Sequence, residues 1–315
     1  MANYAIRRLF ISLMTLLAAS AVIFALIEIL PGDPARIMLG MNASEDAVRS
    51  LQEQMGLNQP LFMRYFSWLF GMLTGDFGRS YTYAVPVADL IRERVVVSLP
   101  LAILSLVLST AIAIPIGIFT ASRRGRPADA AIMGATQLGI ALPNFWLALL
   151  LVYVFAISLR LVPAGGFAGW ETGTWTALKS LLLPAFALAL PQAAILARIT
   201  RSSLIETLAE DYIRTARAKG LSPAQVLYRH ALRNAFIPVV TILGLQFAFL
   251  LAGTIIIENV FYLPGLGRLV FQSITQRDLI VVEGVVVLLV ATVILINFLV
   301  DCSYALIDPR LGADR

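Results

Sequence analysis

Six long stretches with almost no charged residues constrain the fold more than any other feature of the sequence. Crossing about 30 Å of hydrocarbon takes about 20 helical residues, and each stretch is of that order or longer. None shows the polar face at 3.6-residue spacing that marks a helix on a soluble core. The sequence therefore predicts an all-α membrane protein with six transmembrane helices. The stretches are Leu9–Leu30 (in which only Glu28 is charged), Val95–Ser122, Ala130–Leu159, Ser180–Ala197, Asn234–Ile257 and Gly284–Val300.

The first stretch has one alternative interpretation, a cleaved secretory signal, because Arg7 and Arg8 precede it. The apolar run is longer than a signal core, however, and continues into "LPGDPARIM" instead of a small-x-small cleavage site. We therefore expect a retained first span.

The basic residues of the short loops predict the orientation. The loops after the second and fourth spans hold Arg123, Arg124, Arg126, Arg198, Arg201, Arg214, Arg217, Lys219, Arg229 and Arg233; those after the third and fifth hold Arg160, Lys179, Arg268 and Arg277. Positive residues favour the cytoplasmic side. Both termini are therefore expected inside and residues 31–94 outside. This topology accounts for the pI of about 9.6 without nucleic-acid binding.

Two blocks are expected along the chain. Residues 1–94 comprise the first span and a roughly 65-residue external segment, and residues 95–315 form a five-helix core with a cytoplasmic loop at about 199–234. In the external segment, Ser44 is positioned to cap a helix with Ala47 at its third position. The aromatic run 61–73 is about half a span long and is expected at the membrane interface.

Several kinds of chemistry are missing from the sequence. Cys302 is the lone cysteine and His230 the lone histidine, so neither a disulfide nor a zinc site is expected. No G-x-x-x-x-G-K-[ST] motif occurs, so no nucleotide site is expected. No ionisable residue lies near the middle of a span, which disfavours an ion-coupled carrier. The same absence disfavours a membrane-embedded protease, which would need a catalytic base within the bilayer. Asn144 and Gln246 are polar candidates for a pathway wall, although interhelical hydrogen bonds are the alternative.

The segment "TARAKGLSPAQVLYRHALRNAFIP" (215–238) predicts a rigid helical hairpin. Residues 202–219 are expected to continue the fourth span, with Gly220 as the left-handed residue after that helix. Ser222, Pro223 and Gln225 predict a capping box that starts a second helix. That helix is expected to run to Leu232, to end before Pro238, and to present Val226, Leu227, Tyr228, Arg229 and His230. This mixture is typical of a protein contact, and an anionic lipid surface is the alternative.

The hairpin segment and several other motifs of the sequence resemble those of a known protein family. "DYIRTARAKGLSPAQVLYRHALRNAFIPVV" (211–240) resembles the EAA-type coupling loop of ABC importer permeases, in the dipeptide/oligopeptide/nickel branch. "LPGDPARIMLG", "GLNQPLFMRY", "GDFGRS", "LPNFWLALLLVYVF", "IIENVFYLPGLGRLV" and the tail "DPRLG" are similar to the same branch, in the first of its two paired permeases. One departure is Arg214-Thr215-Ala216, which stands where the general pattern has Glu-Ala-Ala.

The resemblance implies a type I importer in the bacterial inner membrane. A homologous second permease, two ATP-binding ABC subunits and an extracytoplasmic solute-binding protein would be its partners, with ATP and Mg used by the ATPases and no cofactor in this chain. The coupling loop would comprise Arg217, Ala218, Lys219, Gly220, Leu221, Ser222, Pro223, Gln225, Val226, Tyr228, Arg229 and His230. An external gate or docking site would comprise Tyr262, Pro264, Gly265 and Gly267, for which an ordinary turn is the alternative.

The cargo is left open by the sequence. Peptides, glutathione-like compounds, opines and chelated nickel are all handled by the branch that the sequence resembles. An ion-coupled secondary carrier is the alternative from another class of protein.

Overall fold

The computed structural model describes residues 2–29, 33–40 and 43–307, and regular structure in these ranges is helical. The chain divides into two compact units, one made of residues 2–97 and 265–295, the other of residues 98–264 and 296 onward. The N-terminal block expected at 1–94 is thus joined in its unit by residues 265–295. The "DPRLG" tail lies outside the described residues.

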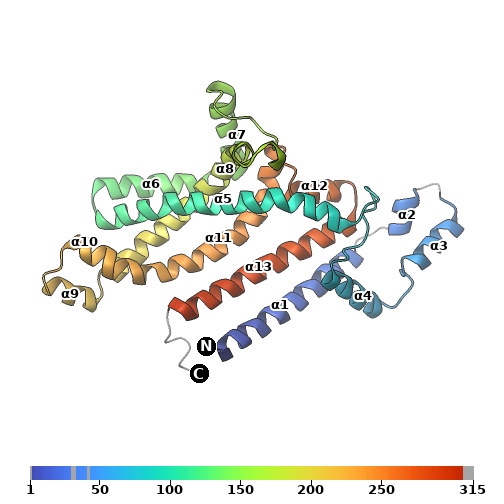
Figure 1. Ribbon diagram of the computed structural model, residues 1–315, viewed down its shortest axis with the longest axis horizontal. Helices are drawn as coiled ribbons and strands as arrows, with labels where there is room; N and C mark the ends of the chain where they lie inside the picture. The colour runs from blue at the N-terminus through green and yellow to red at the C-terminus, as the bar shows by residue number, and fades with distance from the viewer. Residues whose placement is uncertain (1, 30–32, 41–42, 308–315) are drawn as a thin grey trace. The chain divides into compact units, whose positions relative to one another are not determined.

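Five described helices are long and apolar enough to cross a membrane, and a bent pair of helices makes a sixth if it counts as one span (Figure 1). The five crossing segments are Ala5–Ile29 in α1 (Ala2–Ile29), α5 (Val87–Ser122), α8 (Thr174–Thr207), Pro223–Val260, and Leu279–Cys302 in α13 (Leu279–Ile307). The predicted helical membrane protein is confirmed in this form.

The third predicted span is not a single straight helix. α6 (Pro127–Ala141) and the pair α7 (Asn144–Leu151) and η1 (Val152–Ser158), a π-helical turn, meet at an angle of 102°. Pro143 explains the break, because a proline disfavours helical dihedrals at the residue before it. Leu142 accordingly has an extended ψ of 129°. The span predicted over 130–159 is therefore bent at Pro143, and its crossing of the membrane as one span stays a prediction.

α8 is the central helix of the unit formed by residues 98–264. It packs against α6, α7 and α11 (Leu232–Val260). α5 also approaches α8 closely at Gly117, where an added Cβ would lie 2.9 Å from the Ala197 carbonyl oxygen. An ion pair also joins α8 to α6, with Arg201 Nε and Nη2 donating to the two Asp129 carboxylate oxygens at 2.7 and 2.8 Å.

The other unit holds α2 (Pro34–Leu39), α3 (Glu45–Gln54), α4 (Leu61–Thr74) and α12 (Leu266–Thr275), together with α1 and the first parts of α5 and α13. Its core includes Val87, Leu269 and Val281. The predicted cap is confirmed, since the Ser44 hydroxyl accepts a hydrogen bond from the Ala47 amide at 3.3 Å. α4 is held on α1 by a hydrogen bond between the hydroxyl groups of Tyr65 and Ser20.

Candidate functional site

The predicted hairpin between α8 and α11 is present, with two corrections to its helices. α8 ends at Thr207 and a separate helix, α9 (Asp211–Ala218), follows after a turn, so residues 202–219 are not one helix. The second correction concerns the end of the hairpin. α10 (Pro223–Gln225), the π-helical turn η3 (Val226–Ala231) and α11 form one unbroken helical segment over Pro223–Val260. The predicted stop before Pro238 was therefore wrong.

Gly220 makes the first turn of the hairpin. Its φ of +83° is left-handed, as predicted. The Gly220 amide donates to the Arg217 carbonyl at 2.9 Å, and the Leu221 amide donates to the Ala216 carbonyl at 3.4 Å. These two bonds form a Schellman motif, which satisfies carbonyl groups at the end of α9 and fixes the direction of the exit.

Ser222 makes the second turn, and its predicted capping box is confirmed. The Gln225 amide donates to the Ser222 hydroxyl at 3.3 Å, and the Ser222 amide donates to Gln225 Oε1 at 2.9 Å. Pro223 occupies the first helical turn, where its missing N–H costs nothing. Both turns are therefore specified by local hydrogen bonds, which makes the hairpin rigid.

The underside of the hairpin is apolar and packs on the ends of α5 and α8. Ile213 and Ala216 of α9 lie against Val226 and Ala231, with Leu204 of α8 completing the cluster. Val226 is only 1% exposed, so the expectation that it is presented at the surface was wrong. Its place in the helix turns it toward Ile213 instead of outward.

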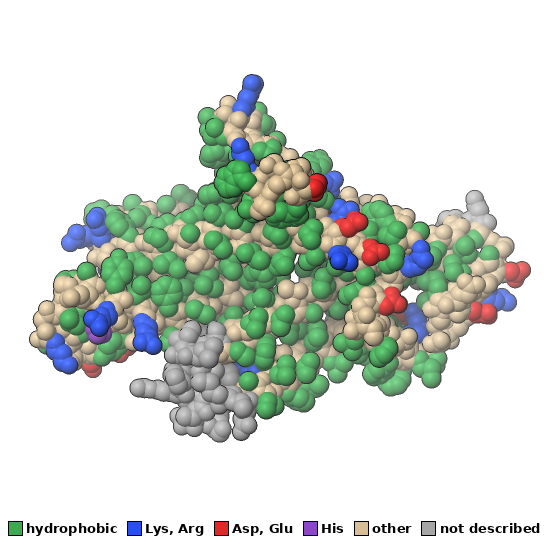
Figure 2. Space-filling model, viewed as in Figure 1, with side chains coloured by type: hydrophobic (Ala, Val, Ile, Leu, Met, Phe, Trp, Pro, Cys, Tyr) green, Lys and Arg blue, Asp and Glu red, His purple; other side chains and the backbone are tan. Residues whose placement is uncertain are grey.

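The outer side of the hairpin is basic and carries the exposed aromatic ring of Tyr228. Arg217, Lys219 and Arg229 are exposed, Tyr228 is 63% exposed, and His230 is half-buried. Figure 2 shows blue and purple side chains gathered over the part of the molecule that Figure 1 labels α9 and α10. The hairpin thus presents a fixed surface of cationic groups around an aromatic ring.

A side-chain hydrogen bond ties the two arms of the hairpin together. The Asn234 amide donates to the Tyr212 hydroxyl at 2.8 Å. This bond joins α9 to the start of α11, so the hairpin is held at its open end as well as at its turns.

The two pathway candidates lie on helices that pack together, α7 and α11. Asn144 is the first residue of α7, directly after the Pro143 break, and is half-buried. Gln246 is 2% exposed, and its Nε2 donates to the Gln192 carbonyl of α8 at 2.8 Å. That bond is an interhelical hydrogen bond, the alternative to a place in the pathway wall. The pathway role of both residues stays a prediction.

The segment at 262–267 combines strained and buried positions. Tyr262 has a positive φ of 53° and is 69% exposed, Pro264 is half-buried, and Gly265 and Gly267 are buried. Next to Tyr262, the Phe261 carbonyl accepts a bond of 2.7 Å from the Gly166 amide. The role of 262–267 as a gate or dock stays a prediction.

Two fully buried carboxylates did not emerge from the sequence. Glu258, near the end of α11, accepts a hydrogen bond from the Ser98 hydroxyl. Asp278 accepts bonds from the Ser80 hydroxyl and from the Thr82 amide. Each partner is 160 or more positions away in the sequence, so no local pattern could have revealed these pairs. The one available signal was the position of Glu258 directly after the apolar run 234–257, which places a carboxylate at the end of a predicted span.

The helical fold and this hairpin define the class of protein to which the chain belongs, a membrane-spanning transport subunit. Two family models match it: "Binding-protein-dependent transport system inner membrane component" over residues 113–313, and the N-terminal component of the same kind of system over residues 1–102. The chain belongs to this family of ABC transporter permeases.

Named relatives and a solved structure agree with this assignment. The chain is 39% identical to "Probable peptide ABC transporter permease protein y4tP" of Sinorhizobium fredii and 41% identical to "Glutathione transport system permease protein GsiC" of Escherichia coli K12, in each case over 311 residues and 99% of both chains. An inward-facing structure of the MetNI methionine ABC transporter is similar in fold, with a TM-score of 0.57 and 20% identity, and the match covers 70% of this chain and 96% of that one.

Proposed function

We propose that the chain forms half of the translocation pathway of an ATP-driven importer for peptides or related small solutes such as glutathione. The names of the two relatives support this range of cargo. A homologous permease would form the other half, and an extracytoplasmic binding protein would deliver the solute. Two ABC subunits would bind and hydrolyse ATP with Mg.

The capped hairpin is the observation that carries the proposal. Local bonds hold both of its turns, its underside is packed on α5 and α8, and its outer side offers exposed Tyr228 and Arg229. Exposed aromatic and arginine residues on a rigid element are favourable for a protein contact. The partner in this proposal is the ATPase, which would move the hairpin as it binds and hydrolyses ATP.

The arrangement of the hairpin also supports the proposed topology in the bacterial inner membrane. Ala121, at the end of α5, belongs to the same apolar cluster as the hairpin. The basic loops after α5 and α8 therefore lie at one end of this unit, which the positive-inside rule places in the cytoplasm. Both termini would then be cytoplasmic and residues 31–94 external.

Purification in mild detergent tests the proposal. The tagged chain, isolated from its native membrane, is expected to bring with it a second permease and ABC subunits, identified by mass spectrometry. The chain alone, even after crosslinking through residues 222–230, would contradict the proposal. Uptake that persists after ATP depletion with ion gradients intact would instead favour the secondary carrier.

A further inference from the structure

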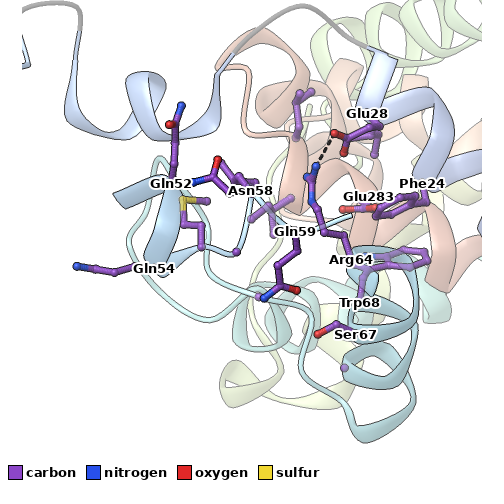
Figure 3. A pocket seen from close by; sticks show the side chains of 18 of the residues that line it. Phe24, Glu28, Gln52, Gln54, Asn58, Gln59, Arg64, Ser67, Trp68 and Glu283 are labelled. Atoms are coloured by element: carbon purple, nitrogen blue, oxygen red, sulfur yellow. Dashed lines mark hydrogen bonds and ion pairs between the residues drawn. The ribbon is translucent and has the colours of Figure 1, made fainter. Parts of the chain in front are cut away.

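A polar cavity lies within the unit made of residues 2–97 and 265–295 (Figure 3). Its volume is about 940 Å³, at the upper end of the range of about 300–1,000 Å³ for small-molecule sites. The end of α1, residues 52–59, α4, residues 76–81 and the start of α13 form its walls. It contains no residue of the hairpin, so binding in this cavity can be measured separately from the coupling of the hairpin to ATP hydrolysis, whereas the natural source of its ligand rests on the proposed function.

The charged side chains of the cavity wall are mostly negative. Arg64 is the single basic residue among those that line it, and its Nη1 is already paired with Glu28 Oε1 at 2.6 Å. The acidic lining residues are Glu28, Asp33, Glu53, Asp76 and Glu283. Two of them have partners in the backbone, since Asp33 caps α2 and Asp76 accepts from the Gly78 amide at 3.0 Å.

Glu283 differs from the other acidic groups because it is 7% exposed and has no cationic partner within 4.0 Å among the described residues. It lines the cavity from α13, on the same side as Glu28, Arg64 and Trp68 (Figure 3). A buried carboxylate is costly unless it is paired. The geometry therefore leaves room for a positive charge that comes from outside the chain.

The indole of Trp68 adds an aromatic ring to this wall. Its buried Nε1 faces the Glu283 carboxylate without reaching full hydrogen-bonding geometry. The ring lies 5.5 Å from that of Phe24, centroid to centroid, and both line the cavity. Aromatic faces attract cations, so this wall favours a positively charged group attached to apolar carbon.

We propose that this cavity binds a primary ammonium group carried on an apolar carbon chain. An ammonium has three N–H donors, and the Glu283 carboxylate and the side-chain oxygens of Asn58 and Gln59 are acceptors in the lining. Met55 and Leu57 offer contacts to the apolar chain. A metal ion fits less well, because the described residues contain no group of three metal-ligating side chains.

A matched set of small molecules tests the charge requirement in the complete transport complex, reconstituted in nanodiscs. Titrations follow tryptophan fluorescence with phenethylamine, with its neutral analogue 2-phenylethanol and with the anion 3-phenylpropanoate. We expect saturable binding of the amine, at least about tenfold weaker binding of the alcohol, as the loss of one charge-assisted hydrogen bond implies, and none of the anion. Equal affinity for amine and alcohol, or no binding of the amine, would overturn the proposal.

Glu283→Gln locates the site, with Glu93→Gln as its matched control. Glu93 is exposed in the same unit and does not line the cavity. We expect Glu283→Gln to weaken amine binding about tenfold and leave alcohol binding unchanged, whereas Glu93→Gln changes neither. Unchanged amine affinity in a folded Glu283→Gln complex would contradict the proposal. If that variant does not fold, the wild-type comparison of the three molecules decides.

The ammonium group could come from a transported solute or from a lysine of a docking protein, and two further measurements separate these sources. Slower uptake of Ala-Ala in Glu283→Gln, with unchanged uptake of N-acetyl-Ala-Ala, identifies the solute. Weaker docking of the binding protein to the variant identifies a lysine. No change in either measurement would exclude both sources and contradict the proposal.

Discussion

At the scale of single residues, Gly220 is the clearest example of a backbone requirement. Its φ of +83° needs the left-handed region, yet no atom lies within 4 Å of the place where a Cβ would be. A side chain at this position would therefore strain the backbone without clashing. A substitution at Gly220 therefore tests the conformation of the turn without disturbing the packing around it.

Gly220→Val is expected to uncouple transport from ATP hydrolysis while the chain still inserts. A β-branched residue resists the left-handed conformation, which costs roughly 1–2 kcal/mol for residues with a Cβ. Gly220→Asn is the matched control, because asparagine visits this region more readily. Uptake and ATPase activity are measured together at equal expression. Wild-type coupling in the valine variant would contradict the proposed role of the turn.

At the scale of helices, close contacts and an ion pair hold α8 in the centre of its unit. The contact with α5 at Gly117 leaves no room for a methyl group: a Cβ there would lie 2.6 Å from Thr200 Cβ and 2.9 Å from the Ala197 carbonyl oxygen. The backbone carbonyl cannot rotate away as a side chain can. The separation of the two helices therefore depends on glycine.

Gly117→Ala is expected to destabilise the chain by about 1–3 kcal/mol, the usual cost of overpacking. Gly134→Ala serves as the control, since Gly134 is an exposed position within α6 with open space around its missing Cβ. Alanine there should be neutral or slightly stabilising. Thermal unfolding of both variants in detergent measures the difference, and equal midpoints would refute the packing argument.

The ion pair between Asp129 and Arg201 makes a second prediction for these helices. Asp129→Asn removes a charge from a carboxylate side chain that is 5% exposed and leaves Arg201 partly buried without its partner. We expect a loss of stability of about 2 kcal/mol, within the range for hydrogen bonds to charged groups.

Arg201→Gln and the double variant complete a cycle with Asp129→Asn. The double variant should lose less stability than the sum of the single variants, because neither partner then remains charged and unpaired. Additive losses in thermal unfolding would show that the pair contributes no coupling.

The sequence predicted local features of these elements better than distant ones. The Gly220 turn, the capping box of Ser222 and Gln225, and the Ser44 cap each depend on residues within six positions of one another, and all three are present. The burial of Val226 depends on Ile213 and on α5, and could not be inferred from the mixture of side chains in its segment.

Helix continuity was also harder to predict from the sequence than the caps. Two prolines within apolar runs have opposite outcomes: Pro143 separates α6 and α7, whereas Pro238 lies inside α11. Neighbouring helices can satisfy a carbonyl that a proline leaves free. Pro238 leaves the Asn234 carbonyl, four positions earlier, without its usual N–H donor, and Ser203 of α8 donates to the adjacent Ala235 carbonyl at 2.9 Å, which anchors this turn of α11 on α8. The sequence around a proline does not contain these neighbours.

At the scale of the whole transporter, the basic outer side of the hairpin is the surface through which we expect partners to act. Arg229→Glu should weaken association with the ABC subunits, because it reverses a charge at the centre of this surface. Co-purification in detergent, with the amount of ABC subunit per permease as readout, measures the effect. Unchanged association would favour the lipid-surface interpretation of the hairpin.

Arg160→Glu is a suitable control for that experiment. Arg160 is exposed but lies in the loop after η1, which belongs to the other side of the membrane in the proposed topology. It should leave the co-purified ABC subunits at the wild-type level. A loss in both variants would point to a general effect of net charge.

The unbroken helix over Pro223–Val260 also fixes a rotational phase. Each helical residue turns the chain by about 100°, from 3.6 residues per turn. Inserting one residue between 232 and 238 would therefore rotate Tyr228 and Arg229 by about 100° relative to the α11 face that packs on α8. Lengthening the loop at 160–169 by one residue would rotate no helix face in this way. The junction between the hairpin and the membrane helix should therefore tolerate neither insertions nor deletions of single residues.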